Sequence, residues 1–371
     1  MAPIPAVPTK ITPQEALQRT IEHREIFHDE MLHLMRQIMS GDMSPVMMAA
    51  LITGLRVKKE TIGEITAAAQ VMREFSTKVD VADKKHLVDI VGTGGDGSGT
   101  FNISTTAAIV VAACGVPVAK HGNRAITSKS GSADVLDALG IRIDHDAVSA
   151  AVSLREHGFA FLFAPLYHPA MRHAGPTRRE IGVRTAFNLL GPLTNPAGAQ
   201  RGLIGVGDEA AAPKVAEVLR LLGAQRMLVV HGAGVDELTL DGTAVLYDVT
   251  PDGINMRRID PAALGLQPAK TAAISGGDPA TNARIVEGVL RGEPGARRDV
   301  VLLNAGAALV AAGVVDRIED GIDRAALTID AGLASELLGA LRAERKAADA
   351  AAAVAAKATS SGNAASAGAP A

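Results

Sequence analysis

A glycine-rich segment near residue 92 has the residue types of an anion-binding loop. Five glycines fall within the eight residues Gly92–Gly99, and the largely polar run Asn102–Thr106 follows at the start of an apolar stretch. Backbone N–H groups reach a phosphate only where side chains are small, and a helix N-terminus adds a favourable dipole. We therefore expect this loop to hold a multiply charged anion, with phosphate as the first candidate.

A second loop adds positive charge. From Val91 to Ala133 the only acidic residue is Asp96, whereas Lys120-His-Gly-Asn-Arg124 follows a predicted strand and carries two cations. Ligands of parallel sheets lie beyond the carboxyl ends of the strands, so both loops should face one pocket. Lysine offers a point charge, and arginine a forked set of N–H donors. Taken alone, Lys120 and Arg124 fit a solvated basic loop as well as they fit a binding site. His121 and Asn123 can hydrogen-bond a second substrate.

An acidic pair, Asp236-Glu237, follows the predicted strand 227–231 and a Gly232-Ala-Gly234 turn. Adjacent carboxylates on a strand-end loop suit Mg²⁺, which keeps several waters and is bridged to substrate phosphates. Acidic pairs are also common on protein surfaces, so this pair is significant only because we expect it at the same sheet edge as the two loops. The sequence thus predicts Mg²⁺ binding there.

Basic residues between 168 and 185 form a further candidate. An arginine within Arg178–Thr185, after His168-Pro-Ala-Met171, can bind a carboxylate through two hydrogen bonds. An amphipathic helix with a solvated basic face explains the same local sequence equally well. The single cysteine, Cys114, lies in an apolar run without an activating neighbour, and we interpret it as a core residue.

The glycine segment also satisfies the dinucleotide fingerprint G-x-G-x-x-G, in Gly92-Thr-Gly-Gly-Asp-Gly97. That fingerprint needs an acid about twenty residues later, and none occurs between Asp96 and Asp134. The helix also begins too late for the third glycine to pack it against the strand. A purely structural turn is the remaining alternative, but one turn does not need five glycines in eight residues.

The composition excludes several classes of function. The chain has 371 residues, of which 47% are hydrophobic and 21% charged, which is the balance of a globular protein. With 2% aromatics and no Trp it lacks stacking platforms for single-stranded nucleic acid, and a net charge of −3 gives no general attraction to nucleic acid or anionic membranes. Its longest apolar runs are shorter than a membrane span and its N-terminus lacks a signal peptide, so we expect a cytoplasmic protein.

The spacing of apolar residues predicts a flexible leader (1–10), a small α-helical domain (11–80) and a large α/β domain (81–346) with a mostly parallel sheet. Thr12 should cap a first helix that begins at Pro13, and Gly41 should end the next. Residues 347–371 are mostly Ala, Ser and Gly, which predicts disorder or a frayed helix. The predicted strands are 87–91, 116–119, 159–163, 203–206, 227–231 and 244–248; the predicted helices of this part are 103–114, 132–139 (capped by Ser132), 148–156, 212–222, 279–290, 300–312 and 329–346.

Taken together, the motifs resemble those of the anthranilate phosphoribosyltransferases of tryptophan biosynthesis, over roughly residues 12–345. The matching motifs, in order, are Gly92-Thr-Gly-Gly-Asp-Gly97, Asn102-Ile-Ser-Thr105, Lys120-His-Gly-Asn-Arg124, Gly131-Ser-Ala-Asp-Val-Leu136, His168-Pro-Ala-Met171, Arg184-Thr-Ala-Phe-Asn-Leu-Leu-Gly-Pro-Leu193 and Asp236-Glu237. One departure is Thr127, where serine is usual before Ser128, and the hydroxyl is kept.

The resemblance implies a reaction, a fold and a site. The amine of anthranilate would attack C1 of phosphoribosyl pyrophosphate and expel pyrophosphate. The fold would be nucleoside phosphorylase-like, with a segment at about 170–195 joining the helical domain, through which homodimers form. Residues implied to contact phosphoribosyl pyrophosphate are Gly92, Gly95, Asp96, Thr100, Asn102, Ile103, Ser104, Thr105, Lys120, His121, Gly122, Asn123, Arg124, Ala125, Ile126, Thr127, Ser128 and Ser132. Those implied to hold anthranilate are Gly92, His121, Asn123, His168 and Arg178, and those implied to bind Mg²⁺ are Ser104, Asp236 and Glu237.

Two other functions stay open at this point. One is a pyrimidine nucleoside phosphorylase of the same fold class, in which inorganic phosphate is the nucleophile. The other is a non-catalytic relative that binds nucleic acid, which would call for a basic surface and lost metal ligands. The negative net charge and the intact Asp236-Glu237 pair favour the transferase.

Overall fold

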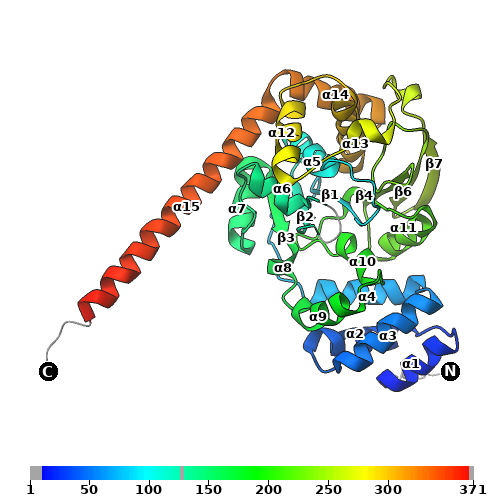
Figure 1. The fold of residues 1–371 in the computed structure, drawn as a ribbon. Helices are drawn as coiled ribbons and strands as arrows, with labels where there is room; N and C mark the ends of the chain where they lie inside the picture. Colours follow the sequence, from blue (N-terminus) through cyan, green and yellow to red (C-terminus); the bar gives the residue numbers. More distant parts are fainter. Residues whose placement is uncertain (1–10, 126–128, 367–371) are drawn as a thin grey trace.

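The computed structural model describes residues 11–125 and 129–366 of the chain. A bundle of N-terminal helices lies at the bottom of Figure 1, beneath a larger part in which helices surround a sheet. The fold is therefore a small helical domain plus a large α/β domain, as the sequence predicts. The bundle helices are α1 (Pro13–Ile21), α2 (His28–Ser40), α3 (Pro45–Lys58) and α4 (Ile62–Glu74).

Local capping signals set the ends of the bundle helices. At the start of α1, the Thr12 hydroxyl accepts from the Glu15 N–H and the Glu15 carboxylate accepts from the Thr12 N–H, a reciprocal capping box. Gly41 ends α2 in the left-handed region at φ 83°, and Ser44 caps α3. The predicted helix starts and stops of this domain are confirmed.

The described residues contain one seven-stranded sheet with the order β3-β2-β1-β4-β5-β6-β7. Its first five strands are parallel, and β6 and β7 are added in antiparallel fashion. The strands are β1 (Val88–Gly92), β2 (Val118–Gly122), β3 (Phe159–Phe163), β4 (Arg201–Gly205), β5 (Arg226–Gly232), β6 (Ala244–Thr250) and β7 (Gly253–Ile259). The sequence analysis missed β7, because most of its side chains are exposed and give no apolar alternation.

Helices cover both faces of the sheet, because successive side chains of a strand point to opposite faces. Leu203 and Leu228 belong to one core with α5 and α13, whereas Ile204 and Val229 belong to another with α11 and the helical bundle. The second core therefore runs continuously from the bundle into the α/β part. The α-helices outside the bundle are α5 (Ile103–Ala113), α6 (Ser132–Ala138), α7 (Ala147–His157), α8 (Ala164–Tyr167), α9 (Met171–Ile181), α10 (Phe187–Leu190), α11 (Ala212–Leu221), α12 (Pro279–Leu290), α13 (Ala296–Ala312), α14 (Ile318–Asp330) and α15 (Leu333–Ser366).

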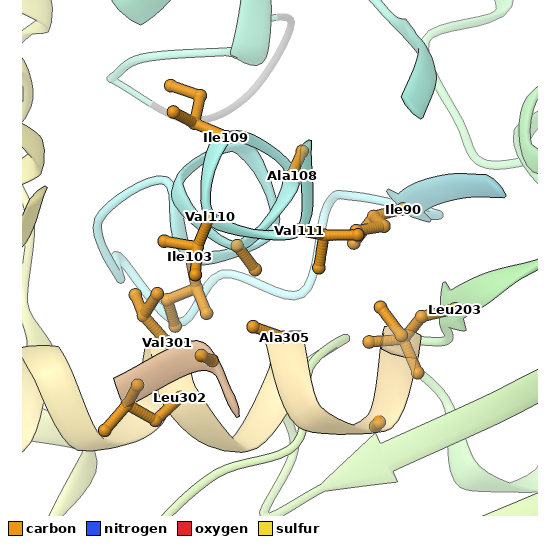
Figure 2. Close-up of a cluster of buried hydrophobic side chains, with 14 of the residues drawn as sticks. Ile90, Ile103, Ala108, Ile109, Val110, Val111, Leu203, Val301, Leu302 and Ala305 are labelled. Atoms are coloured by element: carbon orange, nitrogen blue, oxygen red, sulfur yellow. The ribbon is translucent and has the colours of Figure 1, made fainter. Parts of the chain in front are cut away.

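Helix α5 is buried on nearly all sides and fixes the end of the glycine loop. Figure 2 shows Ile103 and Val110 on the side of α13, near Val301, and Val111 on the side of Ile90 in β1. All of its residues from Thr105 to Ala112 are buried. Such a helix cannot shift without opening the core, so its N-terminus is a rigid support for the loop that precedes it.

Several elements differ from the sequence prediction. Strand β2 begins two residues later than predicted, after Pro117, which has no N–H to donate to the ladder. The helix predicted at 329–346 begins later, at Leu333, because Gly332, at φ 80°, precedes α15. The sequence analysis missed α14 (Ile318–Asp330). Helix α15 continues to Ser366 through the segment predicted as disordered or frayed, since alanine has the highest helix propensity of all residues. Figure 1 shows this helix projecting away from the rest of the molecule.

Candidate active site

The glycine loop after β1 meets the acidic pair after β5 at one edge of the sheet. Asp236 Oδ2 accepts a hydrogen bond from the Gly94 N–H at 2.7 Å, and Glu237 Oε1 accepts one from the Ser104 N–H at 3.0 Å. The two carboxylates therefore contact the loop near its beginning and at its end, where α5 starts. The predicted meeting of the loop and the acidic pair is confirmed.

Glycines make room for the acidic pair. A Cβ on Gly92 would lie 2.1 Å from Asp236 Oδ2, and one on Gly205 would lie 1.5 Å from the Asp236 carbonyl oxygen. The chain reaches this position through a tight turn after β5, in which Gly232 and Val235 exchange backbone hydrogen bonds. Only side-chain-free strand ends allow the turn to pack so closely over β1 and β4.

The two carboxylates lie in an environment that disfavours their charge. Burial, reinforced by the neighbouring Asp96, raises the pKa of Asp236 to about 7. Burial and the charge of Asp236 raise the pKa of Glu237 to about 8, although Lys120 and the Ser104 N–H act in the opposite direction. Carboxylates with too few nearby cations form a natural site for a divalent ion.

The donor set fits Mg²⁺ rather than a transition metal. No group of three or more His, Cys, Asp or Glu side chains with metal-binding geometry occurs in the described part of the chain. Asp236 and Glu237 supply two carboxylates and Ser104 a hydroxyl, so the remaining ligands would be water and substrate oxygens. This is the usual arrangement for Mg²⁺ at a phosphate site, because the ion dehydrates reluctantly.

Lys120 and His121 lie within β2 itself, whereas the sequence analysis placed them after the strand. The Lys120 side chain is buried, and its ammonium donates to the Ile90 carbonyl. Burial lowers the pKa of Lys120, and the carboxylates of Asp89, Glu237 and Asp236 oppose that shift. The lysine therefore lies near the acidic pair, and these carboxylates favour its protonated form.

Asp89 is a buried residue of the site that the sequence analysis did not single out. Its carboxylate accepts from the His121 N–H at 3.1 Å and from Asn195 Nδ2 at 2.7 Å, while burial raises its pKa to about 6. An acid in the middle of an apolar strand, Leu87–Val91, was the available signal, since a buried charge must be paired.

The start of α5 is tied to a second loop and a second helix. Asn102 donates to the Ser130 carbonyl at 3.2 Å, and its side-chain oxygen accepts from Asn282 Nδ2 at 2.8 Å. Asn282, on α12, is a further residue that sequence reasoning missed. These bonds position the glycine loop against the loop that follows β2.

In the loop after β2, Arg124 forms ion pairs with the helix that follows. Its guanidinium binds Asp134 at 2.8 Å and Asp137 at 3.4 Å, both on α6. Both acidic partners of Arg124 are thus close to it in the sequence. The Asn123 carbonyl accepts from the Ser132 hydroxyl at 3.2 Å.

The Asp134 carboxylate joins the two ends of this loop. Asp134 accepts from the N–H groups of Ala125 and Gly131, both at 2.9 Å, so Gly131 rather than Ser132 is the N-cap of α6. Gly122 packs so closely against Ser132 that a Cβ on Gly122 would lie 2.3 Å from the Ser132 hydroxyl. The predicted contacts Ile126, Thr127 and Ser128 lie outside the described residues.

The other predicted contacts divide into accessible and buried groups. The Asp96 carboxylate accepts from the N–H groups of Ser98 and Asp236, so it organises the loop. Thr100 forms a β-bridge with Ser275. Two of the predicted contacts, Ile103 and Thr105, are buried, with 1% of their surface exposed. Their side chains therefore cannot face a ligand. Gly95 is exposed.

His121 and His168 form a buried, uncharged pair. Their ring centroids are 5.0 Å apart. Burial lowers the pKa of His121 to about 3 and that of His168 to about 4. His121 Nδ1 bonds the Gly191 carbonyl at 3.1 Å, and the Nε2 atoms of both rings have no hydrogen-bond partner among the described residues. Two unpaired ring nitrogens are thus available to a ligand.

Arg178 is a largely buried cation without a carboxylate partner in the described part of the chain. Its guanidinium lies 4.9 Å from the ring centroid of Phe187, and burial lowers its pKa. Phe187 begins α10, and the same segment continues to Gly191, which binds His121. The α10 segment therefore connects Arg178 with the histidine pair, and an incoming carboxylate would neutralise this buried charge.

The chain matches two known domain families, one for each part of the fold. Residues 14–76 match the glycosyl transferase family helical bundle domain, and residues 84–335 match the glycosyl transferase family a/b domain. The chain is therefore a glycosyl transferase with a helical bundle and an α/β domain.

Individual relatives narrow this class. Curated anthranilate phosphoribosyltransferases from Acidovorax sp. and Burkholderia ambifaria are 56% and 55% identical to it over 88% and 87% of this chain, and 95% of each relative is covered. A Thermus thermophilus anthranilate phosphoribosyltransferase structure matches with a TM-score of 0.84 at 44% identity, covering 89% of this chain and 99% of that one. The Saccharomyces cerevisiae enzyme in complex with PRPP and Mg matches with a TM-score of 0.79 at 27% identity, covering 92% and 95% of the two chains. The chain belongs to the anthranilate phosphoribosyltransferase family.

Proposed function

We propose that the edge formed by the glycine loop, β2 and the Asp236-Glu237 pair is the site where this chain performs the family's reaction. The reaction transfers the 5-phosphoribosyl group of phosphoribosyl pyrophosphate (PRPP) to the amine of anthranilate and releases pyrophosphate, a step of tryptophan biosynthesis. The observation that carries the proposal is the pair of carboxylates, half-buried Asp236 and buried Glu237, bonded to Gly94 and Ser104 at the two ends of the glycine loop.

The glycine loop and β2 would hold the sugar donor. The leaving pyrophosphate gains negative charge as the C1–O bond breaks, so donors aimed at its oxygens lower the barrier. The backbone from Gly92 to Ser104 would supply N–H groups, and Lys120 in its protonated form would add positive charge. Residues 123–125 and 129–132 would lie at the other end of the donor.

Asp236, Glu237 and the Ser104 hydroxyl would hold Mg²⁺. When bound, the ion neutralises the developing charge on the diphosphate. The yeast relative in complex with PRPP and Mg supports this assignment. So do the raised pKa values of the two carboxylates, because a cation relieves the burial and repulsion that cause them.

Anthranilate would lie between the α10 segment and β2. Arg178 would pair with its carboxylate, while Gly92, Asn123 and the neutral rings of His121 and His168 would line the pocket. The yeast enzyme in complex with 4-fluoroanthranilate supports a site for this substrate class. The aromatic amine is already a neutral nucleophile, so catalysis rests mainly on positioning and on leaving-group stabilisation.

A fluorescence assay tests the function. Loss of anthranilate fluorescence should require both PRPP and Mg²⁺. The matched assay is phosphorolysis of thymidine or uridine with inorganic phosphate. Activity in the second assay alone would favour the nucleoside phosphorylase and reject the proposal.

We extend the proposal to a homodimer formed through the helical bundle. Ile21, Phe27, Val46 and Val57 of this domain are exposed large apolar side chains, which supports an interface there. Light scattering coupled to size-exclusion chromatography should give twice the chain mass.

We also propose a cytoplasmic enzyme. Among the described residues no helix is long and apolar enough to cross a membrane.

A further inference from the structure

Arg184 makes an unusual contact with the glycine loop that no role assigned above explains. Its guanidinium donates to two consecutive carbonyls, Gly95 through Nη1 and Gly94 through Nη2, each at 3.0 Å. A single fork that binds both carbonyls fixes the two peptide planes together.

The N–H groups of the same two peptides point to the other side. In a trans peptide the N–H points opposite to the preceding C=O, so the N–H groups of Gly95 and Asp96 point away from Arg184. Neither N–H has a hydrogen-bond acceptor among the residues that the structure describes. Gly94 and Gly95 both lie in the left-handed region, at φ 68° and 69°, where only glycine is unstrained.

Arg184 belongs to the part of the chain that packs on the helical bundle. It lies between α9, which packs against α2 and α3, and α10, which packs against α4. The loop that it binds belongs to the α/β domain. The side chain is exposed, so the two bonds contribute little to stability.

We infer that Arg184 is a positioning residue that orients the Gly95 and Asp96 amides toward the diphosphate of the sugar donor. It does so from the helical-bundle side, so it couples the relative position of the two domains to the shape of the anion site. The inference rests on the proposed function of the glycine loop. Arg184 itself is assigned no contact with either substrate.

The inference predicts a defect confined to diphosphate recognition. In Arg184→Ala the Kd for inorganic pyrophosphate with Mg²⁺, measured by calorimetry, should rise about tenfold, the value of one lost orienting interaction of roughly 1.4 kcal/mol. The kcat/KM for PRPP should fall by at least that factor, while the KM for anthranilate changes less than twofold. Arg184→Lys should recover part of the loss, because an ammonium binds carbonyls but cannot fork across two.

Arg179→Ala is the matched control, since Arg179 is an exposed arginine on α9 and forms no side-chain hydrogen bond or ion pair recorded for the described residues. It should behave as the parent chain, and added guanidinium should restore activity to Arg184→Ala. Unchanged pyrophosphate affinity in Arg184→Ala, or equal loss for both substrates, would overturn the inference. If the parent chain itself fails to bind pyrophosphate with Mg²⁺, the proposed function fails first, so the two failures are distinguishable.

Discussion

Replacing Gly92 with alanine should disable the acidic pair without unfolding the protein. The new Cβ would lie 2.1 Å from Asp236 Oδ2 and 2.8 Å from its Cγ, whereas ordinary contacts begin at 3.4 Å. The carboxylate would therefore have to move by roughly 1 Å or more, away from the Gly94 N–H that it now binds. A displacement of about 1 Å at a catalytic site costs on the order of 100-fold in rate. The lost charge-assisted hydrogen bond would reduce the free energy of unfolding by about 2 kcal/mol.

The assay is initial rate against Mg²⁺ concentration at saturating PRPP, together with thermal unfolding. We expect a maximal rate lower by about 100-fold and a half-saturating Mg²⁺ concentration higher by about tenfold. Gly339→Ala is the control, because nothing lies within 4 Å of its new Cβ and it sits on α15, where alanine stabilises a helix interior. A Gly92→Ala variant with the parent's rate and Mg²⁺ dependence would refute the account of how Asp236 is positioned.

Three further perturbations test other parts of the site. Arg178→Ala should raise the KM for anthranilate by about tenfold or more and that for PRPP far less, since a bidentate pair is lost; an equal rise for both would exclude a carboxylate-binding role. Asp236→Asn combined with Glu237→Gln should lower turnover at fixed Mg²⁺ and recover partly at high Mg²⁺; unchanged kinetics would remove both from the metal site. The pKa of His168 is lowered to about 4, so the unfolded chain binds a proton that the folded chain excludes, and stability is lost as pH falls below about 6.5. Relative to His168→Gln, the parent should lose about 2 kcal/mol of unfolding free energy between pH 7 and 5, measured by urea titration; parallel curves would show that His168 is not held neutral.

Much of the site can be predicted from the sequence, because its residues follow directly after the ends of predicted strands. The glycine run after β1 and the acidic pair after β5 both leave the sheet at the carboxyl edge, so their meeting follows from the parallel order of the strands. The helix caps at Thr12 and Ser44 are equally local and equally predictable.

The unpredicted parts depend on contacts between distant residues. Asp89 bonds Asn195, Asn102 bonds Asn282, and Arg184 reaches Gly95, and no local spacing encodes these pairs. Arg124 forms a short-range ion pair with Asp134, which the sequence analysis did not predict. The alanine-rich end of α15 is helical through intrinsic propensity, although it lacks the apolar stripe on which the sequence prediction relied.

The central claim is that the glycine loop and the acidic pair together hold a diphosphate and a divalent cation. Anomalous diffraction from crystals grown with Mn²⁺ and PRPP tests it most directly. The account predicts an anomalous peak coordinated by Asp236 or Glu237, with the diphosphate against the Gly95 and Asp96 amides. A peak away from both carboxylates, or a diphosphate at another edge of the sheet, would contradict it.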